Sequence, residues 1–213
     1  MGPPQVCSAA RTAASLHWQC LPAAFISSLG EGFLRVMYVA IASAPNARLI
    51  VAGPAGEPPV GFVAGTTDTR AMFRWLLPRH GLALGLRALP HLWLPSVSCR
   101  VAENGFYLAR RSLLGRRQPG PQQPAPRAEL LSLAVAPQMR HRGVARMLVE
   151  ALDDFLQDRG CAAVRVVTDA ADAGSNGFYS AIGWRVARQF THHGRLVNEY
   201  VHDLCVPRGP GTG

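Results

Sequence analysis

The sequence ELLSLAVAPQMRHRGVARML, residues 129–148, indicates the fold because it joins an apolar strand to an amphipathic helix through a turn that contains glycine and arginine. Residues Glu129 to Val135 are rich in leucine and valine, which predicts a buried strand. Pro137 ends that strand, and the helix that follows is predicted to run to Arg159. A strand, a tight turn and a helix in this order are typical of an α/β domain.

The helix is predicted from the spacing of its apolar residues. They recur at i, i+3, i+4, i+7, i+8, i+11 and i+12, which predicts a single buried stripe. Gly160 stands where a C-terminal cap is expected. The stripe consists of Val144, Met147, Leu148, Ala151, Leu152, Phe155 and Leu156.

On both sides of this stretch the chain alternates strands and helices. After the helix we expect a strand at Ala163 to Thr168, a short helix through Tyr179, and two last strands at Trp184 to Phe190 and Leu196 to Leu204. Before the stretch, residues 9–44 are predicted to be helical, and ARLIVAG and PVGFVAGTT are predicted to pair as a hairpin. The sequence therefore predicts one α/β domain with a mixed sheet over residues 1–213, ending in a flexible tail at 206–213.

The turn at Arg140-x-x-Gly143-x-Ala145 has the composition of an anion-binding loop. Backbone N–H groups at the start of a helix point toward the positive end of the helix dipole, and Gly143 removes a side chain that would hold an anion away. Arg142 and Arg146 add positive charge nearby. The alternative is an ordinary strand-to-helix turn that uses glycine for geometry and arginine for solubility.

The net charge of +9 comes from one segment. All 22 basic residues are arginine, and ten of them lie between Thr69 and Arg127 with Glu103 as the only acid. This segment, residues 69–127, begins helix-like at Arg70 to Leu77 and ends in the proline-rich linker RRQPGPQQPAP. It is either an electropositive surface for an anionic partner or a solvated insertion with an arginine bias.

Cysteine usage and the N-terminal residues favour a cytoplasmic protein. The five cysteines form neither a Cys-x-x-Cys pair nor a Cys/His cluster, so no disulfide framework and no metal site are indicated. The first residues lack an apolar core of signal-peptide length. The most apolar window, which begins at Trp75, is broken by two prolines and contains Arg79 and Arg87, so no transmembrane segment is expected there.

Two motifs resemble the GNAT superfamily of acetyl-CoA-dependent N-acetyltransferases. LSLAVAPQMRHRGVARMLVEAL is similar to its cofactor-binding core, and SNGFYSAIGW is similar to its second cofactor segment. The resemblance implies a central twisted mixed sheet flanked by helices, with residues 69–127 inserted between the third and fourth strands. Only PQVCSA is available for the first strand of that fold, so the start is truncated or the sheet lacks that edge.

The resemblance also assigns cofactor-binding residues. The backbone of the strand end would bind the pantetheine arm and the thioester oxygen, the loop would bind the pyrophosphate, and the second segment would flank the other side of acetyl-CoA. These residues are Leu133, Ala134, Val135, Arg140, His141, Arg142, Gly143, Val144, Ala145, Asn176 and Tyr179. Asp172 departs from the asparagine that is frequent in the family, and an ionised carboxylate cannot donate a hydrogen bond as an amide does.

Two residues are predicted to be catalytic. Tyr179 would donate a proton to the departing thiolate, since a phenol stays protonated at neutral pH. Glu129 would act as general base, because six residues along a strand place it on the same face as Val135. The alternatives are a tyrosine that bonds to neighbouring backbone, and an edge glutamate paired with Arg127 or Arg165.

The resemblance implies transfer of acetyl from acetyl-CoA to a primary amine of a small molecule, peptide or protein by direct transfer, with no metal. The acceptor would lie near Phe25 to Tyr38 and Gln189 to Asn198. The segment 69–127 would be a lid, part of a homodimer interface, or a site for nucleic acid or another acidic macromolecule. A third hypothesis is a regulatory module that binds acetyl-CoA without turnover.

Overall fold

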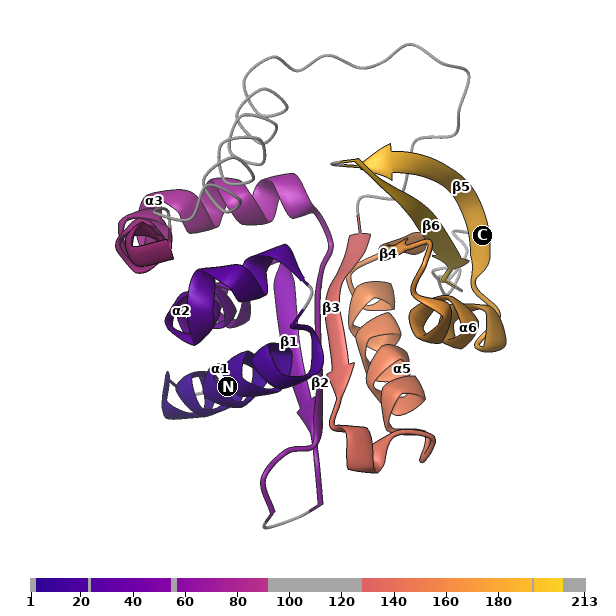
Figure 1. Ribbon diagram of the computed structural model, residues 1–213, viewed down its shortest axis with the longest axis horizontal. Coiled ribbons are helices and arrows are strands. Elements are labelled where there is room, and N and C mark those ends of the chain that lie inside the picture. Colours follow the sequence, from indigo (N-terminus) through magenta and orange to yellow (C-terminus); the bar gives the residue numbers. More distant parts are fainter. Residues whose placement is uncertain (1–2, 23, 55–56, 92–127, 193, 205–213) are drawn as a thin grey trace, which may run out of the picture.

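The computed structural model describes residues 3–22, 24–54, 57–91, 128–192 and 194–204. Its centre is a six-stranded mixed sheet with the order β1-β2-β3-β4-β6-β5 (Figure 1). All neighbouring strands pair antiparallel except β3 and β4, which are parallel. The strands are β1 (Ala47–Ala52), β2 (Gly61–Thr66), β3 (Ala128–Val135), β4 (Ala163–Asp169), β5 (Arg185–His192) and β6 (Arg195–Asp203).

Helices cover both faces of the sheet (Figure 1). One face, called here the α1–α2 face, carries α1 (Pro3–Cys20), the short 3₁₀ helix η1 (Phe25–Leu29), α2 (Gly30–Ser43) and α3 (Thr69–Ala88). The other, called the α5 face, carries α5 (Val144–Gln157) and α6 (Ala173–Ala181). Two further short 3₁₀ helices are η2 (Leu89–His91) and η3 (Pro137–Met139). The predicted α/β fold with a mixed sheet is therefore confirmed.

The N-terminal residues form a helix rather than a strand. The segment PQVCSA lies within α1, whose small residues Ala10, Ala13 and Ala14 are fully buried against the sheet and α2. Among the described residues, the sheet therefore begins at β1 and lacks the additional edge strand. Small side chains at i, i+3 and i+4 let the helix approach its neighbours closely.

The helix α3 is longer than the sequence pattern indicated. Asp68 caps its first turn by accepting hydrogen bonds from the N–H groups of Arg70 (2.8 Å) and Ala71 (3.1 Å). The helix continues through Pro78 to Ala88. The segment continues in η2, and its residues 92–127, which include the proline-rich linker, lie outside the described residues, as does the tail at 206–213.

One described segment, Phe25–Ser43, is long and apolar enough to cross a membrane by length and composition. It comprises η1 and α2, and Leu34, Tyr38 and Ile41 pack in the core of the α1–α2 face. A core helix of a compact domain has the same composition.

The buried stripe of α5 is rotated from the predicted one. Leu148, Leu152 and Leu156 are buried as expected, but Met147 is 52% exposed. Val149 and Asp153 are buried instead. Gly160 closes the helix as predicted, with a positive φ of 72° and its N–H donated to the Gln157 carbonyl (2.8 Å).

Candidate active site

The strands β3 and β4 separate shortly after they begin. They pair only at Ala128 with Val164 and at Glu129 with Arg165, and Figure 1 shows the two strands diverging beyond that point. Leu133, Ala134 and Val135 therefore pair with β2 on one side and have no partner in β4 on the other. The backbone predicted to bind the pantetheine arm thus lies at an opening in the middle of the sheet.

A β-bulge in β3 changes which face its side chains occupy. Ala64 pairs with Ser132 and the next residue, Gly65, pairs with Leu130, so Leu131 is an extra residue. A bulge shifts the alternation of side chains by one residue. Leu131 and Ala134 therefore contact the core of the α1–α2 face.

The prediction that Glu129 and Val135 lie on the same face of the strand is therefore wrong. Val135 packs in the core of the α5 face together with Ala128 and Leu130, the neighbours of Glu129. Because adjacent side chains in a strand point to opposite faces, Glu129 points toward the α1–α2 face, on the same side as Ala134. The extra residue in the bulge is the reason for the difference.

The loop from Arg140 to Ala145 presents unpaired backbone N–H groups beside the end of β3. His141 and Gly143 both have positive φ, 59° and 79°. The N–H groups of His141, Arg142 and Gly143 donate to no carbonyl of the described residues, and those of Val144 and Ala145 belong to the first turn of α5. Arg140 bends back toward the strand, and its Nε donates to the Val135 carbonyl (3.3 Å). Free N–H groups at the start of a helix favour negative charge, which is the property predicted for this loop.

Tyr179 lies in an aromatic cluster on the α5 face. Its ring is 5.2 Å from Trp184 and 5.7 Å from Tyr200, measured between centroids, and the residue is 4% exposed. Burial, with a smaller contribution from the charge of Asp172, raises the pKa of Tyr179 well above its usual value. The hydroxyl makes no hydrogen bond to any residue in the described part of the chain, so the structure does not show the backbone contact that was the alternative.

Asn176 holds α6 against the sheet. Its amide nitrogen donates to the carbonyls of Asp169 (2.8 Å) and Asp172 (2.6 Å), and its side-chain oxygen accepts from Thr168 (2.9 Å) and Asn198 (2.9 Å). Both N–H groups of the amide thus have protein acceptors. A hydrogen bond from this amide to a cofactor, as predicted, would require one of them to be released.

Asp172 has a structural role at the start of α6. Its carboxylate accepts from the hydroxyl (2.6 Å) and the N–H (3.1 Å) of Ser175, which makes it the N-cap of the helix. These bonds hold the pKa of Asp172 below its ordinary value. The departure from asparagine at this position is therefore compatible with the local fold.

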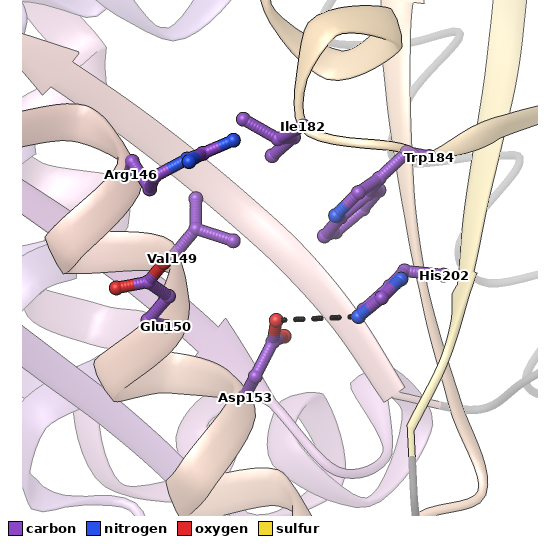
Figure 2. Close-up of a pocket in the computed structure, with 7 residues that line it drawn as sticks. All are labelled: Arg146, Val149, Glu150, Asp153, Ile182, Trp184 and His202. Carbon is purple, nitrogen blue, oxygen red and sulfur yellow. Dashed lines mark ion pairs between the residues drawn. The ribbon is translucent and has the colours of Figure 1, made fainter. Parts of the chain in front are cut away.

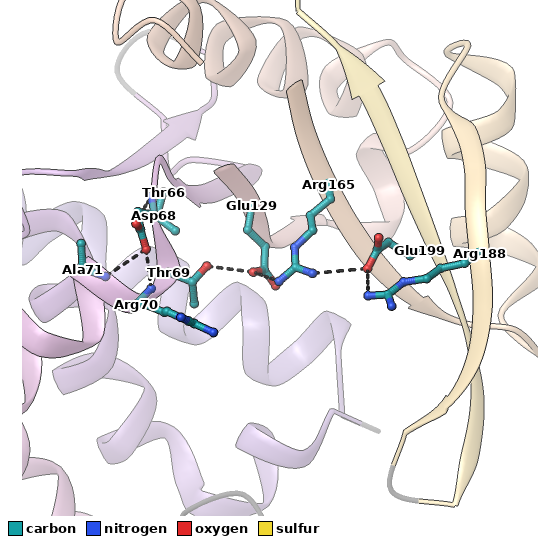
Figure 3. A network of polar contacts seen from close by, with 9 residues as sticks. All are labelled: Thr66, Asp68, Thr69, Arg70, Ala71, Glu129, Arg165, Arg188 and Glu199. Carbon is teal, nitrogen blue, oxygen red and sulfur yellow. Dashed lines mark hydrogen bonds and ion pairs between the residues drawn. The ribbon is translucent and has the colours of Figure 1, made fainter. Parts of the chain in front are cut away.

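Glu129 is part of a line of polar contacts that crosses the sheet (Figure 3). Its Oε2 accepts from the Thr69 hydroxyl of α3 (2.8 Å) and from Nη2 of Arg165 (2.9 Å). Arg165 also donates to Glu199 (3.3 Å), which in turn accepts from Arg188 (2.9 Å). The pairing with Arg165, one of the alternatives for this glutamate, is thus observed, and the role as a base stays a prediction.

A buried histidine, His17, lies against β3, and no sequence motif indicates it. Nδ1 of His17 is 2.6 Å from the Tyr38 hydroxyl and 3.2 Å from that of Ser132. Burial lowers the pKa of His17 to about 4, so the ring is neutral at physiological pH. His17 follows Ala10, Ala13 and Ala14 at i+7, i+4 and i+3, and this spacing is the signal that could have placed it in the core.

Comparisons with known proteins agree with this geometry. The family model described as the acetyltransferase (GNAT) family matches residues 13–184. No curated protein matches the chain. Among solved structures, a GNAT-family protein from Desulfovibrio desulfuricans superimposes with a TM-score of 0.55 at 12% identity, covering 95% of this chain and 94% of that one.

Two other solved structures show the same fold. An aminoglycoside 6'-N-acetyltransferase complexed with coenzyme A has a TM-score of 0.55 at 14% identity, over 93% of this chain and 92% of that one. A further acetyltransferase has a TM-score of 0.54 at 16% identity, over 92% and 94%. Since the family model spans most of the sequence, the chain belongs to the GNAT family of acetyltransferases.

Proposed function

We propose that this protein transfers the acetyl group of acetyl-CoA directly to a primary amine. The observation that carries the proposal is the loop of free N–H groups from His141 to Ala145, which lies at the end of a strand that has separated from its neighbour. A loop of this kind suits a pyrophosphate, and the open strand edge beside it suits an extended, amide-containing arm.

The chain's own groups fit the chemistry of such a transfer. Bound acetyl-CoA supplies an activated acyl group as a thioester. A backbone N–H of residues 133–135 at the open edge of β3 would stabilise negative charge on the thioester oxygen. Tyr179, which burial keeps protonated, has a hydroxyl without a partner among the described residues and would donate the proton that a leaving thiolate needs.

Replacing Tyr179 by phenylalanine is expected to lower kcat by about tenfold to a hundredfold and to change the Kd for acetyl-CoA by less than about twofold. The ring would still pack against Trp184, so stability should be preserved. Steady-state kinetics and calorimetric titration would measure the two quantities. Tyr200→Phe is the matched control, because it removes a neighbouring hydroxyl that already bonds to the Asn176 carbonyl (3.3 Å). Equal kcat values for the parent and Tyr179→Phe would exclude the proton donation.

Glu129 is the candidate base on the α1–α2 face. If it deprotonates the acceptor, Glu129→Gln should lower kcat/KM by about tenfold or more and remove the acidic limb of its pH profile. Glutamine keeps the size of the side chain and its contacts with Thr69 and Arg165. Glu199→Gln, which alters the other carboxylate of Arg165, should leave that limb in place. A pH profile unchanged in Glu129→Gln would leave the residue with a structural role alone.

The α1–α2 face also offers a place for the acceptor. A hollow of about 270 Å³ is lined by Trp18, Pro22, Ser27 and Ser28 at the junction of α1 and η1. Cys20, in the same junction, contacts the Val135 carbonyl through its sulfur (3.7 Å), so this junction lies next to the end of β3. An amine bound there would approach the strand end from the side on which Glu129 lies.

Thiol release from acetyl-CoA tests the proposal as a whole. The purified protein would be assayed with pooled amines, amino acids, aminoglycosides, polyamines and peptides. Release that depends on one pool and on Tyr179 is the expected result. Binding of acetyl-CoA without release in any pool would favour a regulatory module, and failure to bind acetyl-CoA would overturn the proposal.

A further inference from the structure

A hollow of about 300 Å³ lies on the α5 face, between α5 and the end of α6 (Figure 2). It is separate from the hollow near Trp18, which lies on the other face of the sheet. Its lining residues are Arg146, Val149, Glu150, Asp153, Ile182, Trp184 and His202. A hollow of this size holds a small organic molecule.

Asp153 is a buried carboxylate without a hydrogen bond. The residue is 9% exposed, and its Oδ1 has no partner among the described residues. Oδ2 lies 3.7 Å from Nε2 of His202, which is an ion-pair distance when the imidazole is protonated but is longer than a hydrogen bond. Burial, reinforced by the charges of Asp154 and Glu150, raises the pKa of Asp153 to about 7. Oδ1 of this buried carboxylate therefore lacks a hydrogen-bond donor among the described residues.

The walls around Asp153 are suited to a flat cation. Figure 2 shows its carboxylate pointing across the hollow toward His202 and Trp184. These two rings are stacked, with centroids 5.5 Å apart and an interplanar angle of 10°. Glu150 adds a second carboxylate one helical turn away, and Ile182 and Val149 add apolar surface. Carboxylates in a hollow with aromatic and apolar walls favour an organic cation.

The other charged groups of the hollow restrict what the ligand can be. Arg146 lies two turns before Asp153 on α5, so its positive charge borders the hollow at the end away from Asp153. His202 faces Asp153 from β6. Among the residues that the structure describes, no group of three metal-binding side chains is present. N–H donors of a ligand would supply the partner that Asp153 Oδ1 lacks.

We propose that this hollow binds a small organic cation that carries N–H donors on a flat apolar body, such as an amidinium or an arylalkyl ammonium. The N–H groups would bond to Oδ1 of Asp153, and the apolar body would lie beside the stacked rings of Trp184 and His202. This ligand is distinct from the acceptor amine, since it binds on the opposite face of the sheet. The proposal does not depend on acetyl transfer.

Benzamidine is the probe, because it is a flat cation with N–H donors, and benzamide is its neutral counterpart of similar shape. Binding would be followed by the NMR signal of the Trp184 indole N–H, identified with Trp184→Phe, at about pH 8, where Asp153 is ionised. We expect benzamidine to shift this signal with a Kd in the millimolar range, and benzamide to shift it at least about tenfold more weakly.

Asp153→Asn should weaken benzamidine binding by about tenfold or more. This variant is expected to fold, because it removes an ionisable group that burial disfavours. Asp154→Asn makes the same change at an exposed neighbour outside the hollow and should change the Kd by less than about twofold. Benzamidine should shift the Trp184 signal equally in the presence of saturating acetyl-CoA, because the two ligands would bind at different sites. Equal binding by the parent and Asp153→Asn, or no shift in the parent, would overturn the proposal and leave water as the partner of Asp153.

Discussion

Replacing Arg165 by methionine is expected to lower the free energy of unfolding by about 3 kcal/mol, because it leaves the buried Glu199 and the half-buried Glu129 without their shared partner. The guanidinium side chain is 14% exposed and joins Glu129 to Glu199, whose side chain is 4% exposed. Burial alone would lower the pKa of Arg165, but the two glutamates outweigh that effect and raise it. Chemical denaturation of the purified proteins would measure the loss.

Arg185→Met is the matched control for this prediction. Arg185 also lies on a strand and pairs with a carboxylate, Asp203, at 3.5 Å, but the two side chains are 57% and 71% exposed. Exposed ion pairs contribute little, so the control should lose less than about 1 kcal/mol. If Arg165→Met were no less stable than Arg185→Met, the line of contacts in Figure 3 would have no role in stability.

The fold could be predicted largely from local patterns. The strand-turn-helix unit, the hairpin of β1 and β2 and the pair β5 and β6 all follow from apolar periodicity and turn residues within short windows. The N-terminal helix shows where this fails. The segment PQVCSA has no decisive pattern of its own, and its place in α1 depends on packing of the alanines that follow it.

Side-chain direction could be predicted less well than element type. The bulge at Leu131 reverses the face of Glu129 relative to Val135, and nothing in the sequence of an apolar strand marks a bulge. In α5, apolar residues at Met147 and Phe155 suggested the buried stripe, whereas the helix turns Asp153 inward instead. A period of 3.6 residues leaves several rotations of a helix nearly equivalent, and tertiary packing decides among them.

The parts of the predicted site differ in how well the sequence could place them. The strand end at Leu133 to Val135 and the loop at Arg140 to Ala145 are adjacent, because one chain segment connects them without interruption. Asn176 depends on contacts between α6, β4 and β6, which are distant in sequence. Its hydrogen bonds could therefore not be predicted from the motif alone.

Replacing Gly143 by alanine is expected to weaken binding of coenzyme A by about tenfold to a hundredfold. Gly143 has a φ of 79° at the N-cap of α5, where any other residue is strained by roughly 1 kcal/mol. A Cβ atom built at this position meets no atom within 4 Å, so the fold itself has room for it. The open space lies among the free N–H groups, and a methyl group there would hold a pyrophosphate away from them.

Gly160→Ala is the control that separates a loss of coenzyme A binding from the effect of backbone strain. Gly160 has a φ of 72°, and a Cβ there also meets no atom within 4 Å, but it lies past the opposite end of α5. Both variants should therefore lose similar stability in thermal unfolding, whereas Gly143→Ala alone should lose affinity in a calorimetric titration with coenzyme A. Equal affinity in the two variants would mean that the pyrophosphate does not contact the backbone at Gly143. A parallel loss in both would mean that a strained helix end, rather than the space above the loop, controls binding.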